Sequence, residues 1–97
     1  MKKVIIDCEK LNERKRAHRY LAEIFEFPDY YGKNLDALFD CLMELGECTI
    51  VLQGEETLRQ KEGYAARILQ VLEEAVHENP GLKLETQTDH LPEQENL

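Results

Sequence analysis

Two short, uninterrupted apolar runs constrain the fold of this chain most strongly. "KVII" starts at residue 3 within an expected strand over about residues 2–7, and "TIVL" forms a second strand over residues 49–52. Continuous runs of this length are typical of strands covered by helices, because both faces of such a strand are buried. Segments with helical periodicity separate the two runs. Strands that are joined through helices favour a parallel sheet.

The first helical segment is "NERKRAHRYLAEIFEF", in which apolar residues recur every three or four positions. Asn12 is its expected N-cap, and Pro28 ends it because a proline biases the preceding residue away from helix. Its basic residues fall mainly on the solvent side. We place His18 on that side too and interpret it as a solvated helix residue.

The second helical segment starts from Asn34, a good N-cap, and is expected to run to about Leu45. Its apolar stripe consists of leucines at i, i+3, i+7 and i+10, counted from Leu35, so one face of this helix packs into the core. Gly46 is expected to end it as a C′ residue.

The C-terminal half continues the alternation of helix and strand. "YAARILQVLEEAVHE" predicts a third amphipathic helix, which "NPG" ends, and the alternating "LKLETQT" predicts a strand with one wet face at a sheet edge. The polar residues 54–63 are compatible with a short helix, and residues 89–97 lack periodicity and are expected to be disordered. We therefore predict one α/β domain over residues 1–88, with a small three-stranded parallel sheet and three to four helices.

The net charge of the chain disfavours some classes of binding partner. The 97 residues carry a formal net charge of −8, although residues 1–19 are rich in lysine and arginine. A protein of this balance mostly repels phosphate, so we expect no nucleic-acid partner, and a basic protein partner suits it better. The alternative is that acidic charge only keeps a small protein soluble. No run is long enough for a membrane helix or a signal peptide, so we expect a cytoplasmic protein without a membrane partner.

The residue inventory does not favour an enzyme. The chain has no serine, no glycine-rich phosphate loop and no histidine–cysteine spacing typical of metal ligands, so we expect no cofactor and no metal. The three cysteines, Cys8, Cys41 and Cys48, are expected to be reduced thiols. Carboxylates beside Cys41 disfavour a thiolate, so we interpret this residue as a small buried hydrophobe.

An unfavourable pair of charges marks the second helix. Asp36 and Asp40 lie four residues apart, and like charges at this spacing destabilise a helix by about 0.2–0.5 kcal/mol. The helix dipole favours Asp36 in the first turn but gives Asp40 little. Phe39 lies between them, and Glu44 continues the row. From these residues alone, a solvated face and a protein-binding patch rimmed by carboxylates stay open as interpretations.

The segment "FPDYYGKNLDALFDCL" closely resembles the central segment of the barstar family, intracellular inhibitors of secreted bacterial ribonucleases of the barnase type. The resemblance extends to "ILQVLEEA", "KVII" and "IVL" and covers about residues 2–88. It implies a three-stranded parallel sheet covered by helices. It also implies that the second helix and its preceding loop enter the ribonuclease active site, where carboxylates occupy the places of RNA phosphates.

The resemblance implies the partner and the site. The partner would be a basic, extracellular-type ribonuclease, and the free protein a monomer. Asp40 matches the position of the family's dominant contact. The expected contact residues are Tyr30, Tyr31, Gly32, Asn34, Leu35, Asp36, Phe39, Asp40, Glu44 and Glu74. Phe39 and Leu45 stand where the family has tryptophan, and residues 53–63 match poorly. The alternative is therefore an interaction protein with this fold, a different basic partner or toxin, and no ribonuclease inhibition.

Overall fold

The computed structural model describes residues 2–54 and 63–87. Its elements, in chain order, are β1 (Lys2–Asp7), the 3-10 turn η1 (Cys8–Leu11), α1 (Arg14–Phe25), α2 (Leu35–Met43), β2 (Cys48–Gln53), α4 (Tyr64–Glu78) and β3 (Leu82–Gln87). The short helix considered within residues 54–63 and the disordered tail expected over residues 89–97 lie outside the described residues, apart from the two flanking glycines.

The three strands form one parallel sheet in the order β1-β2-β3. In the register, Val4 of β1 lies beside Ile50 of β2, which lies beside Leu84 of β3. The α/β class and the parallel sheet predicted from the sequence are confirmed. The alternating strand β3 lies at an edge, as its pattern predicted, and the apolar run of β2 lies in the centre.

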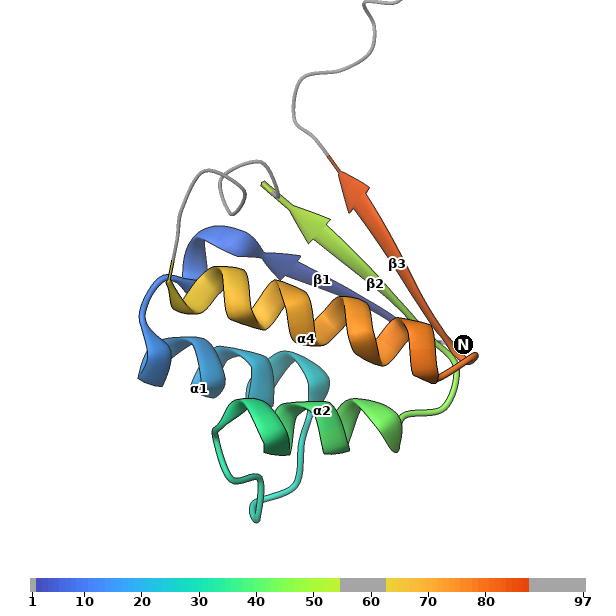
Figure 1. Ribbon diagram of the computed structural model, residues 1–97, viewed down its shortest axis with the longest axis horizontal. Helices are drawn as coiled ribbons and strands as arrows, with labels where there is room; N and C mark the ends of the chain where they lie inside the picture. The colour runs from blue at the N-terminus through green and yellow to red at the C-terminus, as the bar shows by residue number, and fades with distance from the viewer. Residues whose placement is uncertain (1, 55–62, 88–97) are drawn as a thin grey trace, which may run out of the picture.

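The helices pack against one face of this sheet (Figure 1). Val4 and Ile6 of β1 and Ile50 and Leu52 of β2 point into the core that the helices cover. The expectation that helices cover the apolar strands on both sides is wrong for β1: Ile5, on the opposite face, is 47% exposed. An edge strand in a two-layer fold needs only one apolar face, so an uninterrupted run does not require burial on both sides.

Capping interactions set the helix boundaries. Asn34 is the N-cap of α2, as predicted, and its Oδ1 accepts a hydrogen bond from the Ala37 N–H at 2.8 Å. The N-cap predicted for α1 is wrong by one residue. Glu13 caps this helix by accepting from the Arg16 N–H at 2.9 Å, while Asn12 ends the preceding 3-10 turn.

The C-terminus of α2 differs from the prediction. The helix ends at Met43, and Gly46 is not among the glycines with positive φ, so it is no left-handed C′ residue. Asn79, at the end of α4, takes over the role. Its buried side-chain amide donates to the Leu42 and Leu45 carbonyls at 3.1 and 3.2 Å. This contact satisfies the orphan carbonyls of α2 and fixes the end of α2 against the end of α4.

His18 is buried, so its interpretation as a solvated residue is wrong. Its side chain is 1% exposed, with Nδ1 2.6 Å from the Tyr31 hydroxyl and Nε2 2.5 Å from the Tyr64 hydroxyl. Burial lowers the pKa of His18, and the nearby Arg14 charge lowers it further. His18, Leu21 and Phe25 stand at i, i+3 and i+7, so His18 lies on the buried face of α1.

Candidate functional site

A groove of about 460 Å³ lies between α2 and α4. It combines apolar side chains with carboxylates from both helices. We call it the acidic groove, and its lining residues are Leu35, Asp36, Phe39, Asp40, Val71 and Glu74. Five of these six were expected at or near a partner contact from the sequence, and the structure brings together residues that are more than thirty positions apart in the chain.

The α2 side of the acidic groove follows from helix geometry. Leu38 and Leu42 are fully buried and hold the helix against the core. Asp36 and Asp40 are four residues apart, so they project from one side of α2, and both are exposed. Phe39 is half-buried and packs against the edge of the core while it lines the groove. The helix therefore presents two carboxylates beside an aromatic ring.

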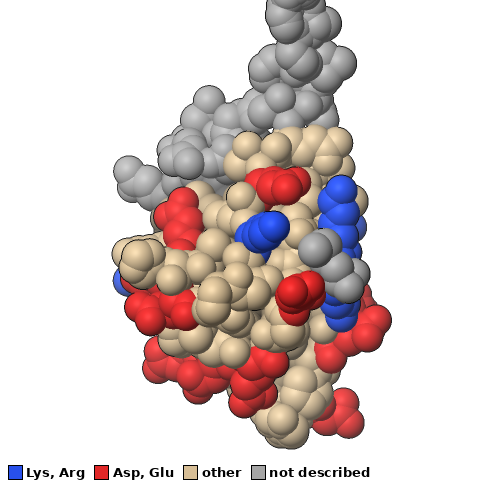
Figure 2. All heavy atoms as spheres, turned by 90° about the vertical axis from the view of Figure 1, so that its right-hand side faces the viewer, with Lys and Arg blue, Asp and Glu red and all other residues tan. Residues whose placement is uncertain are grey.

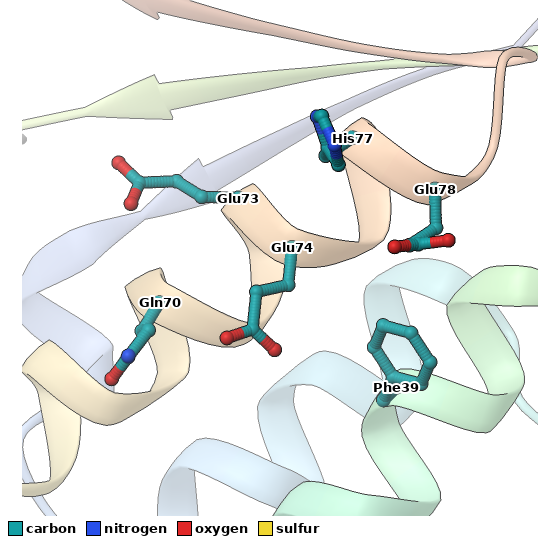
Figure 3. Close-up of a pocket in the computed structure, with 6 residues that line it drawn as sticks. All are labelled: Phe39, Gln70, Glu73, Glu74, His77 and Glu78. Atoms are coloured by element: carbon teal, nitrogen blue, oxygen red, sulfur yellow. The ribbon is translucent and has the colours of Figure 1, made fainter.

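The α4 side supplies the remaining carboxylates (Figure 3). Phe39 points from α2 toward α4, while Glu74 and Glu78 point from α4 toward α2; Glu73 and His77 point away. An adjoining hollow of about 390 Å³ shares Phe39 and Glu74 with the acidic groove and also includes Glu78.

Sequence reasoning named only Glu74 on this helix and missed two of its neighbours, Val71 and Glu78. The signal was available, because Val71 lies three residues before Glu74 and Glu78 four residues after it, which places all three on one helix face. Once the family resemblance assigns Glu74 to the contact, helical spacing indicates the other two.

No basic side chain of the described residues neutralises these carboxylates. The one salt bridge between described residues joins Lys2 Nζ and Glu26 at 4.0 Å, away from the acidic groove. Figure 2 shows acidic side chains gathered over the lower, helical part of the face that includes the end of α4, with basic side chains mostly toward one border. The groove therefore gathers carboxylates that have no salt-bridge partner among the described residues beside the ring of Phe39.

The two tyrosines of the loop before α2, both expected to contact a partner, differ in exposure. Tyr30 is 80% exposed, so its ring is available to a partner. Tyr31 is 5% exposed and its hydroxyl lies beside the buried His18, so its side chain offers little surface to a partner, and its partner contact stays a prediction. Burial raises the pKa of its hydroxyl. Gly32 and Asn34 are exposed at the loop–helix junction, and Glu44 is exposed at the end of α2, outside the acidic groove.

Cys41 is half-buried against the core on α2. Burial raises the pKa of its thiol, and the Glu44 and Asp40 carboxylates raise it further, so the thiolate is disfavoured as the sequence suggested. Within residues 2–54 and 63–87, no group of three or more histidine, cysteine, aspartate or glutamate side chains could hold a metal ion. In the same residues, no helix has the length and apolarity needed to span a bilayer.

The sequence is similar to those of known proteins. The family model described as "Barstar (barnase inhibitor)" matches residues 1–89. The chain belongs to the barstar family. A relative from Bacillus subtilis (strain 168), named "Putative ribonuclease inhibitor YrdF", is 41% identical over 81 residues, which cover 80% of this chain and 89% of the relative. The barstar-family match includes α2, its preceding loop and α4, the elements that form the acidic groove.

Proposed function

We propose that this member of the barstar family is a cytoplasmic inhibitor of a basic, barnase-like ribonuclease. It binds by protein–protein contact and blocks the enzyme's active site with the acidic groove and the loop before α2. The observation that carries this proposal is the convergence of Asp36, Asp40 and Glu74, all without a paired cation among the described residues, around Phe39. Like charges at i, i+4 destabilise the free helix, and this cost is offset if the two carboxylates stabilise a complex with a basic partner.

Charge complementarity gives the mechanism. A ribonuclease must hold RNA phosphates, so its active site presents arginine, lysine and histidine donors. Carboxylates at the spacing of Asp36 and Asp40 offer those donors the same bidentate acceptors as a phosphate. Because opposite potentials also speed encounter, we expect rapid association that slows as salt is added.

Aromatic side chains supply the apolar part of the contact. Tyr30 is exposed on the loop before α2, and Phe39 lines the acidic groove together with Asp40, so both rings are available to a partner. Buried aromatic anchors surrounded by polar groups carry most of the binding free energy in protein interfaces. We assign Asp40 the central electrostatic contact and Asp36 and Glu74 supporting contacts on either side of the groove.

A second candidate keeps this surface and changes the partner. The resemblance places tryptophan where this chain has Phe39, and phenylalanine offers a smaller ring with no N–H donor. A basic toxin or another cationic protein with a shallower cleft would accept that surface equally well. This candidate predicts salt-sensitive binding to such a protein with no effect on RNA cleavage by a barnase-type enzyme.

The test is titration calorimetry of the full chain against a barnase-type ribonuclease at low and high salt, with RNA cleavage followed in parallel. The proposal predicts one-to-one binding that blocks cleavage and weakens as salt increases. Binding that leaves cleavage intact would support the second candidate. Absence of binding to any ribonuclease encoded by the same organism would reject the inhibitor function.

A further inference from the structure

A second hollow, of about 410 Å³, has the opposite charge. Its lining residues are Arg14, Lys15 and Arg19 of α1 and Lys33 of the loop before α2. We call it the basic hollow. Each of the described residues that line it is cationic, in a protein whose net charge is −8. The ribonuclease-inhibitor function uses the acidic groove and gives no role to this feature.

None of the four cations of the basic hollow forms a salt bridge in the described part of the chain. Carboxylates are nevertheless close, since Glu13 interacts electrostatically with Lys15, and Glu23 and Asp29 line an adjoining hollow together with Arg19 and Lys33. The salt bridge between described residues involves Lys2 and Glu26, neither of which lines the hollow. Arg14 and Lys15 also lie in the first turn of α1, where the helix dipole disfavours positive charge, and that turn contains no acidic residue. The N-cap Glu13 offsets part of this cost, but its carboxylate is engaged with the Arg16 N–H.

Part of the basic hollow is held in place before any ligand arrives. The Arg14 guanidinium lies 5.9 Å from the centroid of the Tyr64 ring, and the Tyr64 hydroxyl is hydrogen-bonded to the buried His18 ring. Lys33 follows Gly32 and precedes the Asn34 cap of α2, so its backbone is tied to the start of that helix. Cations that are fixed in this way lose less entropy when they bind an anion.

We propose that the basic hollow binds a di- or triphosphate group, either free or as part of a nucleotide. A single phosphomonoester carries about −1.5 to −2 charges at neutral pH, and a di- or triphosphate carries more, so four cations match a di- or triphosphate better than a single phosphate. Two arginines provide planar forks that pair with phosphate oxygens, and two lysines provide point charges beside them. The volume lies within the usual range for small-molecule sites, roughly 300–1,000 Å³.

The neighbourhood of the basic hollow favours a small ligand over a nucleic-acid strand. Lys33 lies only three residues before Asp36, so the hollow adjoins the acidic groove. A long polyanion that crossed the hollow would meet these carboxylates, whereas a compact phosphate group would not. The net negative charge of the chain acts in the same direction, since it repels extended strands at long range.

The experiment is calorimetry on the full chain without any ribonuclease, at physiological salt, so its result is independent of the inhibitor proposal. The probes are inorganic pyrophosphate, inorganic tripolyphosphate, guanosine triphosphate and a short single-stranded RNA. The test variant is the double substitution Arg19→Gln and Lys33→Gln. The matched control is Lys3→Gln and Lys83→Gln, which removes the same charge from exposed positions aligned across the uncovered sheet face.

We expect saturable binding of tripolyphosphate that falls at least about ten-fold in the test variant and stays within about two-fold in the control. Equal affinities for tripolyphosphate and guanosine triphosphate would assign recognition to the phosphates alone, and tighter nucleotide binding would add contacts to the nucleoside. Equal losses in both variants, or no saturable binding of any di- or triphosphate, would overturn the proposal. Binding of RNA without binding of tripolyphosphate would overturn it in favour of a nucleic-acid surface.

Discussion

The acidic groove and the buried cluster around His18 use polar side chains in opposite ways. In the cluster, both ring nitrogens of His18 have a hydroxyl partner, Tyr31 on one side and Tyr64 on the other. In the groove, Asp36 and Asp40 are exposed and have no paired cation among the described residues. A few polar groups are thus fully satisfied inside the fold, while others are left open at its surface.

This contrast separates stability from recognition. A buried polar group without a partner costs about 1–3 kcal/mol, so the cluster must be satisfied within the chain itself. Exposed carboxylates are hydrated in the free protein and carry no such penalty, so they can stay without a protein partner until a complex forms. Substitutions in the cluster should therefore change the free energy of unfolding, and substitutions in the acidic groove should change the free energy of binding.

The largest effect is expected from Asp40→Ala on ribonuclease binding. Loss of the central carboxylate leaves cations of the enzyme without a partner, so we expect at least about 2 kcal/mol, or about thirty-fold in Kd. Asp36→Ala and Glu74→Ala should cost less, and Glu85→Ala, on the far sheet face, should be near neutral. Calorimetry on the four variants gives the ranking, and equal losses at all four positions would contradict the assignment of Asp40.

The next effect is on stability, from Tyr31→Phe. This change removes the hydroxyl beside His18 Nδ1 in a buried site, and we expect a loss of about 1–3 kcal/mol in the free energy of unfolding. Tyr64→Phe should cost less, because Tyr64 is only half-buried and water can replace its hydroxyl. Urea denaturation measures both. If Tyr31→Phe instead weakened ribonuclease binding with stability unchanged, Tyr31 would belong to the contact surface after all.

The cluster should also make stability depend on pH. The folded protein lowers the pKa of His18 below its ordinary value of 6.5, so the unfolded chain binds more protons as the solution is acidified. The contribution is therefore fully present above about pH 6.5 and is lost as pH falls from there through the folded pKa, with a slope of at most about 1.4 kcal/mol per pH unit. Urea midpoints between pH 7.5 and 5.5 measure it. His77→Gln, at an exposed position, should leave the slope unchanged, whereas an unchanged slope in His18→Gln would contradict the assignment.

The smallest effect is expected from Asp40→Asn, which should change stability and ribonuclease binding in opposite directions. Asp40→Asn removes the repulsion with Asp36, so the free protein should gain about 0.2–0.5 kcal/mol of stability while its ribonuclease affinity falls. Asp36→Asn should gain less, because Asp36 also benefits from the helix dipole in the first turn. Thermal unfolding at low salt detects the difference. A loss of stability in Asp40→Asn would show that this carboxylate has a structural role.

Local signals predicted the fold well and long-range contacts poorly. The extent of α4 and the Asn34 cap depend on neighbouring residues, and both were predicted from the sequence. The burial of His18 depends on hydroxyls that lie 13 and 46 residues away, so its polar side chain was placed in solvent. The N-cap of α1 was displaced by a 3-10 turn that carries no strong sequence signal.

The candidate site was predicted in part for a similar reason. The spacing of Asp36, Phe39 and Asp40 marks one face of α2, which local periodicity shows. Glu74 was placed beside them only through the family resemblance, because nothing local indicates which α4 residues meet α2. The basic hollow was missed entirely, since it joins α1 to the loop before α2 and its α1 residues had been assigned to a solvated helix face.

The most direct test of the inhibitor account is competition at the ribonuclease active site. Calorimetry would measure the affinity of the full chain for a barnase-type ribonuclease at rising concentrations of guanosine 3′-monophosphate, a nucleotide whose phosphate should compete for the enzyme's phosphate-binding cleft. The Arg19→Gln, Lys33→Gln variant would be measured in parallel, so that nucleotide bound to the basic hollow is accounted for. The account predicts that the apparent Kd rises linearly with nucleotide concentration, both for the unmodified chain and for the variant. An apparent Kd that stays constant would place the contact outside the active site and contradict the account.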